Sequence, residues 1–179
     1  MNICGIDEAG RGSLAGPLVM AGARALKPYK IKELTDSKKI SSNKREYFFD
    51  LIKKHYEYVV VFQDNILIDK KGLSYCLNIS LNEIKSSLKA EKYIFDGPHS
   101  YGVDDLECII KGDEKINEIS AASIIAKVTR DRFMSCLNEK YNIYDFRSHK
   151  GYGTKKHKAL IHKYGLSDIH RKSFKIKKT

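Results

Sequence analysis

The sequence has no apolar stretch of about 18 residues or more, and its start, MNICGIDEAG, has neither a basic segment nor a long apolar one. The first absence excludes a transmembrane helix, and the second argues against a cleaved signal peptide. The cysteines lie at least 28 residues apart, so they form no CxxC pair and no dense disulfide framework. We therefore expect a cytoplasmic protein without a membrane partner, whose cysteines are reduced and buried as small apolar residues. The four are Cys4, Cys76, Cys108 and Cys136.

Proline is scarce, with three residues in 179, and no stretch rich in proline, glycine and serine divides the chain. Internal repeats and low-complexity segments are also missing. Hydrophobic residues make up 42% of the sequence and aromatic residues 10%, which is typical of a folded protein. We expect one domain over residues 1–179, with a helical C-terminal segment at about residues 142–179.

Charge is present in excess of one sign: 33 lysines and arginines against 22 acidic residues give a net charge of +11. Such an excess favours a polyanionic partner such as nucleic acid. A solvated lysine-rich surface is the alternative, and the charge alone does not decide between them. The basic end of the chain, RKSFKIKKT, is likewise either a phosphate-contacting tail or a frayed terminus.

Hydrophobic periodicity predicts strands that alternate with helices, hence an α/β fold with a mixed sheet flanked by helices in one domain. Asn43 and Glu46 have the spacing of a helix capping box. In the long helix predicted from Asn117 to about Tyr141, the apolar stripe includes Ala122, Ala126 and Phe133. The predicted strands are 2–7, 18–26, 58–63, 92–97 and 106–113, and the other predicted helices are 41–57, 73–88 and 154–165.

Four acidic residues, Asp7, Glu8, Asp96 and Asp113, fall at the ends of predicted strands and next to glycines or close to them. In α/β proteins, ligands bind at the edge formed by the C-terminal ends of the strands. Mg²⁺ prefers carboxylates together with water and substrate phosphates, and a pair of metal ions would offset the repulsion among clustered acids. Adjacent strand residues point to opposite faces, so Asp7 and Glu8 reach one site only if the strand ends there. Each acid taken alone is more often a surface carboxylate.

The glycine-rich segment that follows contains Gly10, Arg11 and Gly12. Glycine permits close approach of a ligand to the main chain, and arginine binds phosphate in bidentate fashion. The segment matches neither GxGxxG nor the Walker loop, so by itself it is only weak evidence for contact with a phosphate or a sugar.

Several blocks of the chain, taken together, resemble ribonuclease HII, the type 2 ribonucleases H, over roughly Ile3 to Phe174. The resemblance implies an RNase H-like fold with a helical C-terminal part. It also implies endonucleolytic cleavage of the RNA strand of RNA–DNA hybrids, and incision of duplex DNA 5′ of embedded ribonucleotides, as in ribonucleotide excision repair. Products would carry 5′-phosphate and 3′-hydroxyl ends. The blocks are GIDEAGRGSLAGP, DSKKIS, IFDGP, KGDEKINEISAASIIAKVTRDRFM, HKGYGT and HRKSF.

The resemblance assigns the acidic quartet to Asp7, Glu8, Asp96 and Asp113, which would hold two Mg²⁺ or Mn²⁺ ions with substrate bound. It assigns recognition of the 2′-hydroxyl to Gly10, Arg11, Gly12 and Tyr152. This hydroxyl is the group that distinguishes RNA from DNA. Phosphate contacts are implied for Lys38 and Lys39 and, more weakly, for Lys127 and Lys150. Asp131, a rival for the fourth acid, is interpreted as a helix-surface ion pair, and His149 and His157 as exposed loop residues without a catalytic role.

Two positions depart from the family pattern. Ser13 stands where proline is usual, which predicts a less rigid turn, and Pro98 follows FDG, which could shift the loop after Asp96. One alternative hypothesis is ribonuclease HIII, but its extra N-terminal domain would have no room before a catalytic block that begins at residue 3. A second is a nucleic-acid-binding protein without catalytic activity, and the presence of all four acidic residues argues against it. The tail shows no clear sliding-clamp motif, and we expect a monomer.

Overall fold

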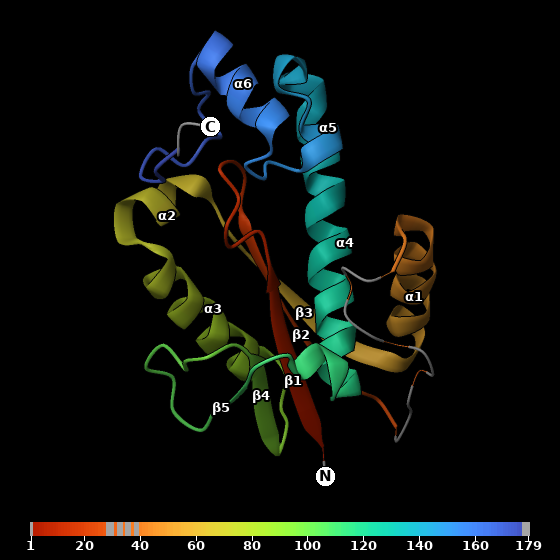
Figure 1. Cartoon of the computed structure of the whole chain (residues 1–179). Coiled ribbons are helices and arrows are strands. Elements are labelled where there is room, and N and C mark those ends of the chain that lie inside the picture. Colours follow the sequence, from red (N-terminus) through yellow and green to blue (C-terminus); the bar gives the residue numbers. More distant parts are fainter. Residues whose placement is uncertain (1, 28–30, 32–33, 35–36, 38–39, 177–179) are drawn as a thin grey trace.

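The computed structural model describes residues 2–27, 31, 34, 37 and 40–176, and its centre is a five-stranded sheet in the order β3-β2-β1-β4-β5 (Figure 1). β1 pairs antiparallel with β2 and parallel with β4, so the sheet is mixed, as predicted. β2 pairs antiparallel with β3, and β4 pairs parallel with β5. The strands are β1 (Ile3–Ala9), β2 (Leu18–Ala25), β3 (Tyr56–Gln63), β4 (Lys92–Asp96) and β5 (Glu107–Ile109).

Helices cover both faces of the sheet (Figure 1). α1 and α4 pack on one face through alanine, isoleucine and phenylalanine side chains, and α2 and α3 cover the other. Among the described helices, none is long and apolar enough to cross a membrane. The helices are α1 (Ser42–His55), α2 (Asn65–Lys71), α3 (Leu73–Ser87), α4 (Asn117–Lys140), α5 (Phe146–His149) and α6 (Lys155–Tyr164), with 3₁₀ turns η1 (Gly112–Glu114) and η2 (Asn142–Tyr144).

The contact between β1 and α4 is unusually close because Gly5 has no side chain. A Cβ atom at Gly5 would lie 2.3 Å from backbone atoms of Glu118 and Ile119 at the start of α4. α4 therefore lies directly against the central strand, and its small residues Ala121 and Ala122 are fully buried there.

The C-terminal part is helical, as expected, and packs on the far end of α4 (Figure 1). α6 begins after the N-cap Thr154 and ends at Gly165, whose φ of +79° suits a helix C-terminus. The basic segment beyond it is held in place: Asp69 on α2 accepts hydrogen bonds from the backbone N–H groups of Lys172 and Ser173. The tail is thus anchored at least this far along the chain.

Several expectations from the sequence are wrong in detail. β1 continues through Ala9, two residues beyond the predicted end. The cap of α1 is Ser41, whose hydroxyl accepts from the Lys44 N–H, so Asn43 and Glu46 do not form the predicted capping box. Phe133 is 37% exposed because it lies off the buried face of α4. The short helix α2 was not predicted at all, since it is too short to show a period.

Candidate metal centre and substrate groove

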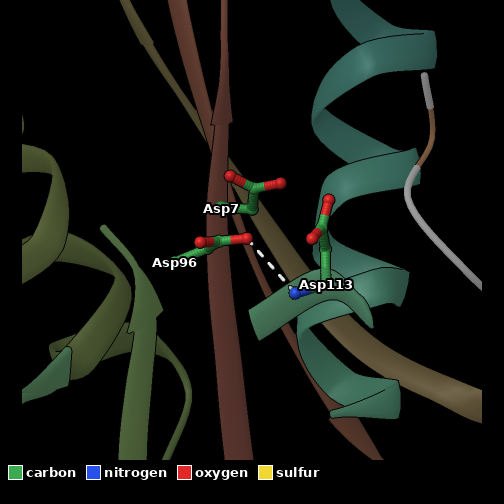
Figure 2. A group of neighbouring side chains, drawn as sticks. All are labelled: Asp7, Asp96 and Asp113. Atoms are coloured by element: carbon green, nitrogen blue, oxygen red, sulfur yellow. Dashed lines mark hydrogen bonds between the residues drawn. The ribbon is translucent and has the colours of Figure 1, made fainter. Parts of the chain in front are cut away.

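Three of the four predicted acids come together in space. Asp7, Asp96 and Asp113 each offer a carboxylate oxygen, and these atoms all lie within 4.8 Å of one another (Figure 2). The Asp113 N–H donates to Asp96 Oδ2 at 3.2 Å, the dashed line in Figure 2. Three carboxylates at this spacing are a suitable donor set for a hard divalent cation.

Parallel pairing of β1 with β4 explains how residues distant in sequence meet. Ile6 is paired with Phe95, so the next residues, Asp7 and Asp96, lie side by side at the same edge of the sheet. Asp113 reaches them from η1, the turn between β5 and α4, and not from a strand as predicted. The Ser120 hydroxyl donates to the Asp113 carbonyl at 2.5 Å and ties this turn to α4.

Burial raises the pKa of Asp7 well above its usual range, and the nearby carboxylates of Glu8 and Asp96 raise it further. Hydrogen bonds from the Ser123 hydroxyl and the Glu8 N–H act in the opposite direction. Within the described part of the chain, neither Asp7 nor Asp96 forms an ion pair with a lysine or arginine. A bound cation would stabilise the ionised carboxylates, so the cluster fits a metal ion better than a buried ion pair.

Glu8 lies outside this group of three. It follows Asp7 directly on β1, which continues through Ala9, and it lines the groove beside the glycine turn. The Glu8 carboxylate lies 3.6 Å from the Arg11 guanidinium, on the side of the glycine turn. The quartet implied by the resemblance is thus, in this structure, a triad plus one adjacent acid.

A groove of about 390 Å³ lies between the glycine turn and α4. Both elements expected to recognise the sugar, the Gly10–Gly12 turn and Tyr152, line it. Lys127 also lines it, with its Nζ 5.4 Å from the centroid of the Tyr152 ring. The full lining is Glu8, Ala9, Gly10, Arg11, Gly12, Ser37, Ser123, Lys127 and Tyr152.

The serine at position 13, in place of the family's usual proline, predicts a less rigid turn, but hydrogen bonds hold the turn in place. The Ser13 hydroxyl donates to the Gly10 carbonyl at 2.8 Å, and the residue is fully buried. The Arg11 carbonyl accepts from the buried Arg171 guanidinium at 2.9 Å, and the Arg11 side chain donates to the Tyr101 hydroxyl at 2.5 Å. Serine therefore fixes the turn through its hydroxyl, and the loop after Asp96, which contains Tyr101, supports it.

The basic residues have different surroundings. Lys38 and Lys39 lie outside the described residues. Lys127 forms an ion pair of 2.8 Å with Asp131, which is the helix ion pair expected for Asp131, although its partner is not a neighbouring arginine. Lys150 donates to the Ser135 hydroxyl at 2.5 Å. Of these lysines, Lys127 faces the groove.

The expectation that His149 and His157 are exposed loop residues is wrong, because both are buried. Together with His170 they form a cluster under the C-terminal helices. The His149 and His157 rings stack at 4.1 Å, and His157 Nε2 lies 3.1 Å from His170 Nε2. Since His157 Nδ1 faces the Tyr152 carbonyl and His170 Nδ1 accepts from the Ser167 N–H, the network fixes neutral tautomers for both. Burial lowers the pKa of each of these two to about 4. The cluster is structural and has no contact with the acidic triad.

Carboxylates that bind divalent cations, next to a groove in a protein of net charge +11, are typical of hydrolases that act on nucleic acids. The fold and the site therefore define a metal-dependent nuclease with an RNase H-like architecture. The chain belongs to the ribonuclease HII family, whose family model matches residues 4–177. It is accordingly a type 2 ribonuclease H, an endonuclease class that acts on RNA–DNA hybrids.

Relatives agree over nearly the whole length. Ribonuclease HII of Aliarcobacter butzleri is 52% identical over 178 residues, with 98% of this chain and 92% of the relative covered. Ribonuclease HII of Sulfurovum sp. is 47% identical over 175 residues, with the same coverage.

Solved structures support the same fold. Ribonuclease HII of Archaeoglobus fulgidus, in a complex with PCNA, superposes with a TM-score of 0.86 at 28% identity, covering 100% of this chain and 98% of that one. Ribonuclease H2 of Pyrococcus horikoshii gives 0.80 at 28% identity, covering 98% and 95%. Bst-RNase HIII with Mn²⁺ gives 0.71 at 20% identity; this chain covers 67% of its length, and at that identity the likeness concerns the fold alone.

Proposed function

We propose that this protein cleaves the RNA strand of RNA–DNA hybrids and incises duplex DNA on the 5′ side of single embedded ribonucleotides. The products would carry 5′-phosphate and 3′-hydroxyl ends. The observation that carries the proposal is the position of the acidic triad beside a groove whose lining includes both the glycine turn and Tyr152.

Asp7, Asp96 and Asp113 would hold the metal, with Glu8 as the fourth acid. When bound, two Mg²⁺ or Mn²⁺ ions would supply activation of the attacking water and stabilisation of the leaving 3′-oxygen. The chain itself fixes the ligands: the Glu8 N–H and the Ser123 hydroxyl hold Asp7, and the Asp113 N–H holds Asp96. Asp7 and Asp113 are buried and Asp96 is half-buried, and repulsion among three carboxylates this close together would favour a bound cation.

Recognition of the ribose would come from two elements that line the groove, the glycine turn and Tyr152. Gly12 is exposed and has open space where a side chain would be, so a sugar can approach the main chain there. Tyr152 presents a ring against which the sugar packs. Phosphates next to the ribonucleotide would contact Lys127 and, beyond the described residues, Lys38 and Lys39.

The protein would act as a monomer in the cytoplasm. The segment SFKIKKT has no clear sliding-clamp motif, although the Archaeoglobus relative was solved with PCNA. Light scattering that gives a dimer mass would contradict the monomer.

The test uses a labelled DNA duplex with one ribonucleotide, an all-DNA duplex and an RNA–DNA hybrid, each with Mg²⁺ or Mn²⁺. Incision 5′ of the ribonucleotide, and none in all-DNA duplex, is expected. Asp7→Asn should lower cleavage by at least about a thousandfold while duplex affinity stays within a few fold, because the loss concerns the metal site. Wild-type turnover in Asp7→Asn would refute the metal assignment.

Two other outcomes correspond to the alternatives. Cleavage of hybrids without incision at single ribonucleotides would favour activity like that of ribonuclease HIII. Salt-sensitive binding with no product in either metal would favour a binding protein without catalysis.

A further inference from the structure

Arg130 on α4 is fully buried, which is rare for an arginine. Among the described residues no carboxylate forms an ion pair with it. Its guanidinium instead donates to three backbone carbonyls and one hydroxyl: Nε to the Pro17 carbonyl (2.9 Å), Nη1 to the Lys150 carbonyl (2.8 Å), and Nη2 to the Ser13 Oγ (2.7 Å) and the Ala15 carbonyl (3.0 Å).

These acceptors belong to two segments far apart in sequence. Residues 13–17 follow the glycine turn, and residue 150 begins the loop that carries Tyr152. One rigid planar group therefore fixes the spacing between the segment next to the glycine turn and the segment next to Tyr152, and both the turn and Tyr152 line the groove.

The glycine turn lies directly on Arg130. Gly10 has a φ of +88°, and a Cβ atom built on it would lie 2.0 Å from Arg130 Nε. The Ser13 hydroxyl accepts from Arg130 and donates to the Gly10 carbonyl, so hydrogen bonds run from the guanidinium to the turn itself. The missing side chain at Gly10 thus makes room for Arg130, whereas Gly12 is the glycine that faces open space.

Arg130 also contacts Tyr152. Its Cζ lies 5.1 Å from the centroid of the ring, a cation–π distance that orients the ring. An apolar residue at this position of the α4 stripe would avoid the cost of burying a charge. It would supply none of the donors that hold both segments.

We propose that Arg130 is a positioning residue for ribonucleotide recognition: by holding the Gly10–Gly12 turn and Tyr152 at a fixed separation, it sets the preference of the groove for a ribose over a deoxyribose. Ser13 is its link to the turn. The inference rests on the proposed function, since it concerns which sugar that groove accepts, and it adds two residues that do not touch substrate.

The experiment measures affinity in the non-cleaving Asp7→Asn background for two duplexes that differ only in one 2′-hydroxyl. The dissociation constant for the all-DNA duplex divided by that for the ribonucleotide-containing duplex measures the preference for ribose, because contacts with phosphates are common to both duplexes. Arg130→Lys, which keeps the charge but not the planar fork, and Ser13→Ala, which removes the link, should each lower this ratio about tenfold, the loss expected for one or two hydrogen bonds. Affinity for the all-DNA duplex should remain unchanged.

Arg132→Lys is the matched control, because Arg132 is an exposed arginine on the same helix, paired with Glu46. It should leave the ratio as in the parent. Ser13→Ala keeps the test decisive if Arg130→Lys fails to fold. A preserved ratio in a folded Ser13→Ala or Arg130→Lys protein, or an equal loss of affinity for both duplexes, would overturn the proposal. A parent protein without any ribose preference would instead refute the proposed role of the turn.

Discussion

Gly10 and Gly12 belong to one turn but have opposite surroundings. Gly10 is buried, has a φ of +88° and leaves no room for a methyl group, whereas Gly12 is exposed with nothing within 4 Å of a built Cβ. At the scale of single residues, the first glycine is therefore required by the fold, and the second is free to serve a ligand.

Gly10→Ala should lower the free energy of unfolding by about 2–4 kcal/mol, because the left-handed backbone and the overlap with Arg130 both oppose a side chain. Gly12→Ala should change it by less than about 1 kcal/mol yet reduce incision at a single ribonucleotide at least about tenfold. Urea unfolding and the duplex assay measure the two effects. Equal stability of both variants would contradict this distinction.

At the scale of elements, the close contact of β1 with α4 positions the site. α4 carries Ser123, which hydrogen-bonds Asp7, and Ser120, which holds the Asp113 turn. Movement of this helix away from the strand would therefore separate the carboxylates.

Gly5→Ala should lower the free energy of unfolding by about 1–3 kcal/mol, because the new methyl group overlaps backbone atoms of α4, which cannot rotate away. Cleavage at limiting Mn²⁺ should fall more than cleavage at saturating Mn²⁺, since the triad is displaced and not removed. Gly12→Ala, with open space around it, is the control for stability. An unchanged unfolding midpoint in Gly5→Ala would show that the helix adapts without cost.

The strands, the long helices and the mixed sheet could be predicted, because hydrophobic residues recur with a clear periodicity in the strands and in the long helices. The position of the Glu8 side chain was harder to predict, since it depends on whether β1 ends at Asp7 or continues to Ala9. Arg130 follows Ala122 and Ala126 at intervals of four residues, a spacing that predicts a position on the buried face of the helix. Its charge, however, predicts an exposed side chain, so the spacing alone did not identify it as buried. The carbonyls that accept its hydrogen bonds come from distant segments, and no local pattern identifies them.

For the whole molecule, the buried histidines predict loss of stability in acid. His157 and His170 have pKa values near 4 when folded and about 6.5 when unfolded, so the unfolded chain binds more protons between these values. Stability is complete above about pH 6.5 and falls as the pH drops toward 4, by about 3 kcal/mol for one such histidine.

Urea midpoints at pH 7.5, 6 and 5 would measure this fall. His157→Gln should flatten the dependence on pH, and His162→Gln, at an exposed position of α6, should leave it unchanged. A midpoint that does not move between pH 7.5 and 5 would contradict the neutral cluster.

Arg171 reaches back across the molecule to the carbonyls of Arg11 and Gly16, so a residue near the end of the chain completes the turn near its beginning. During synthesis, the acidic residues leave the ribosome long before Arg171 does. The glycine turn is therefore complete only after the segment that follows α6 has packed back against it.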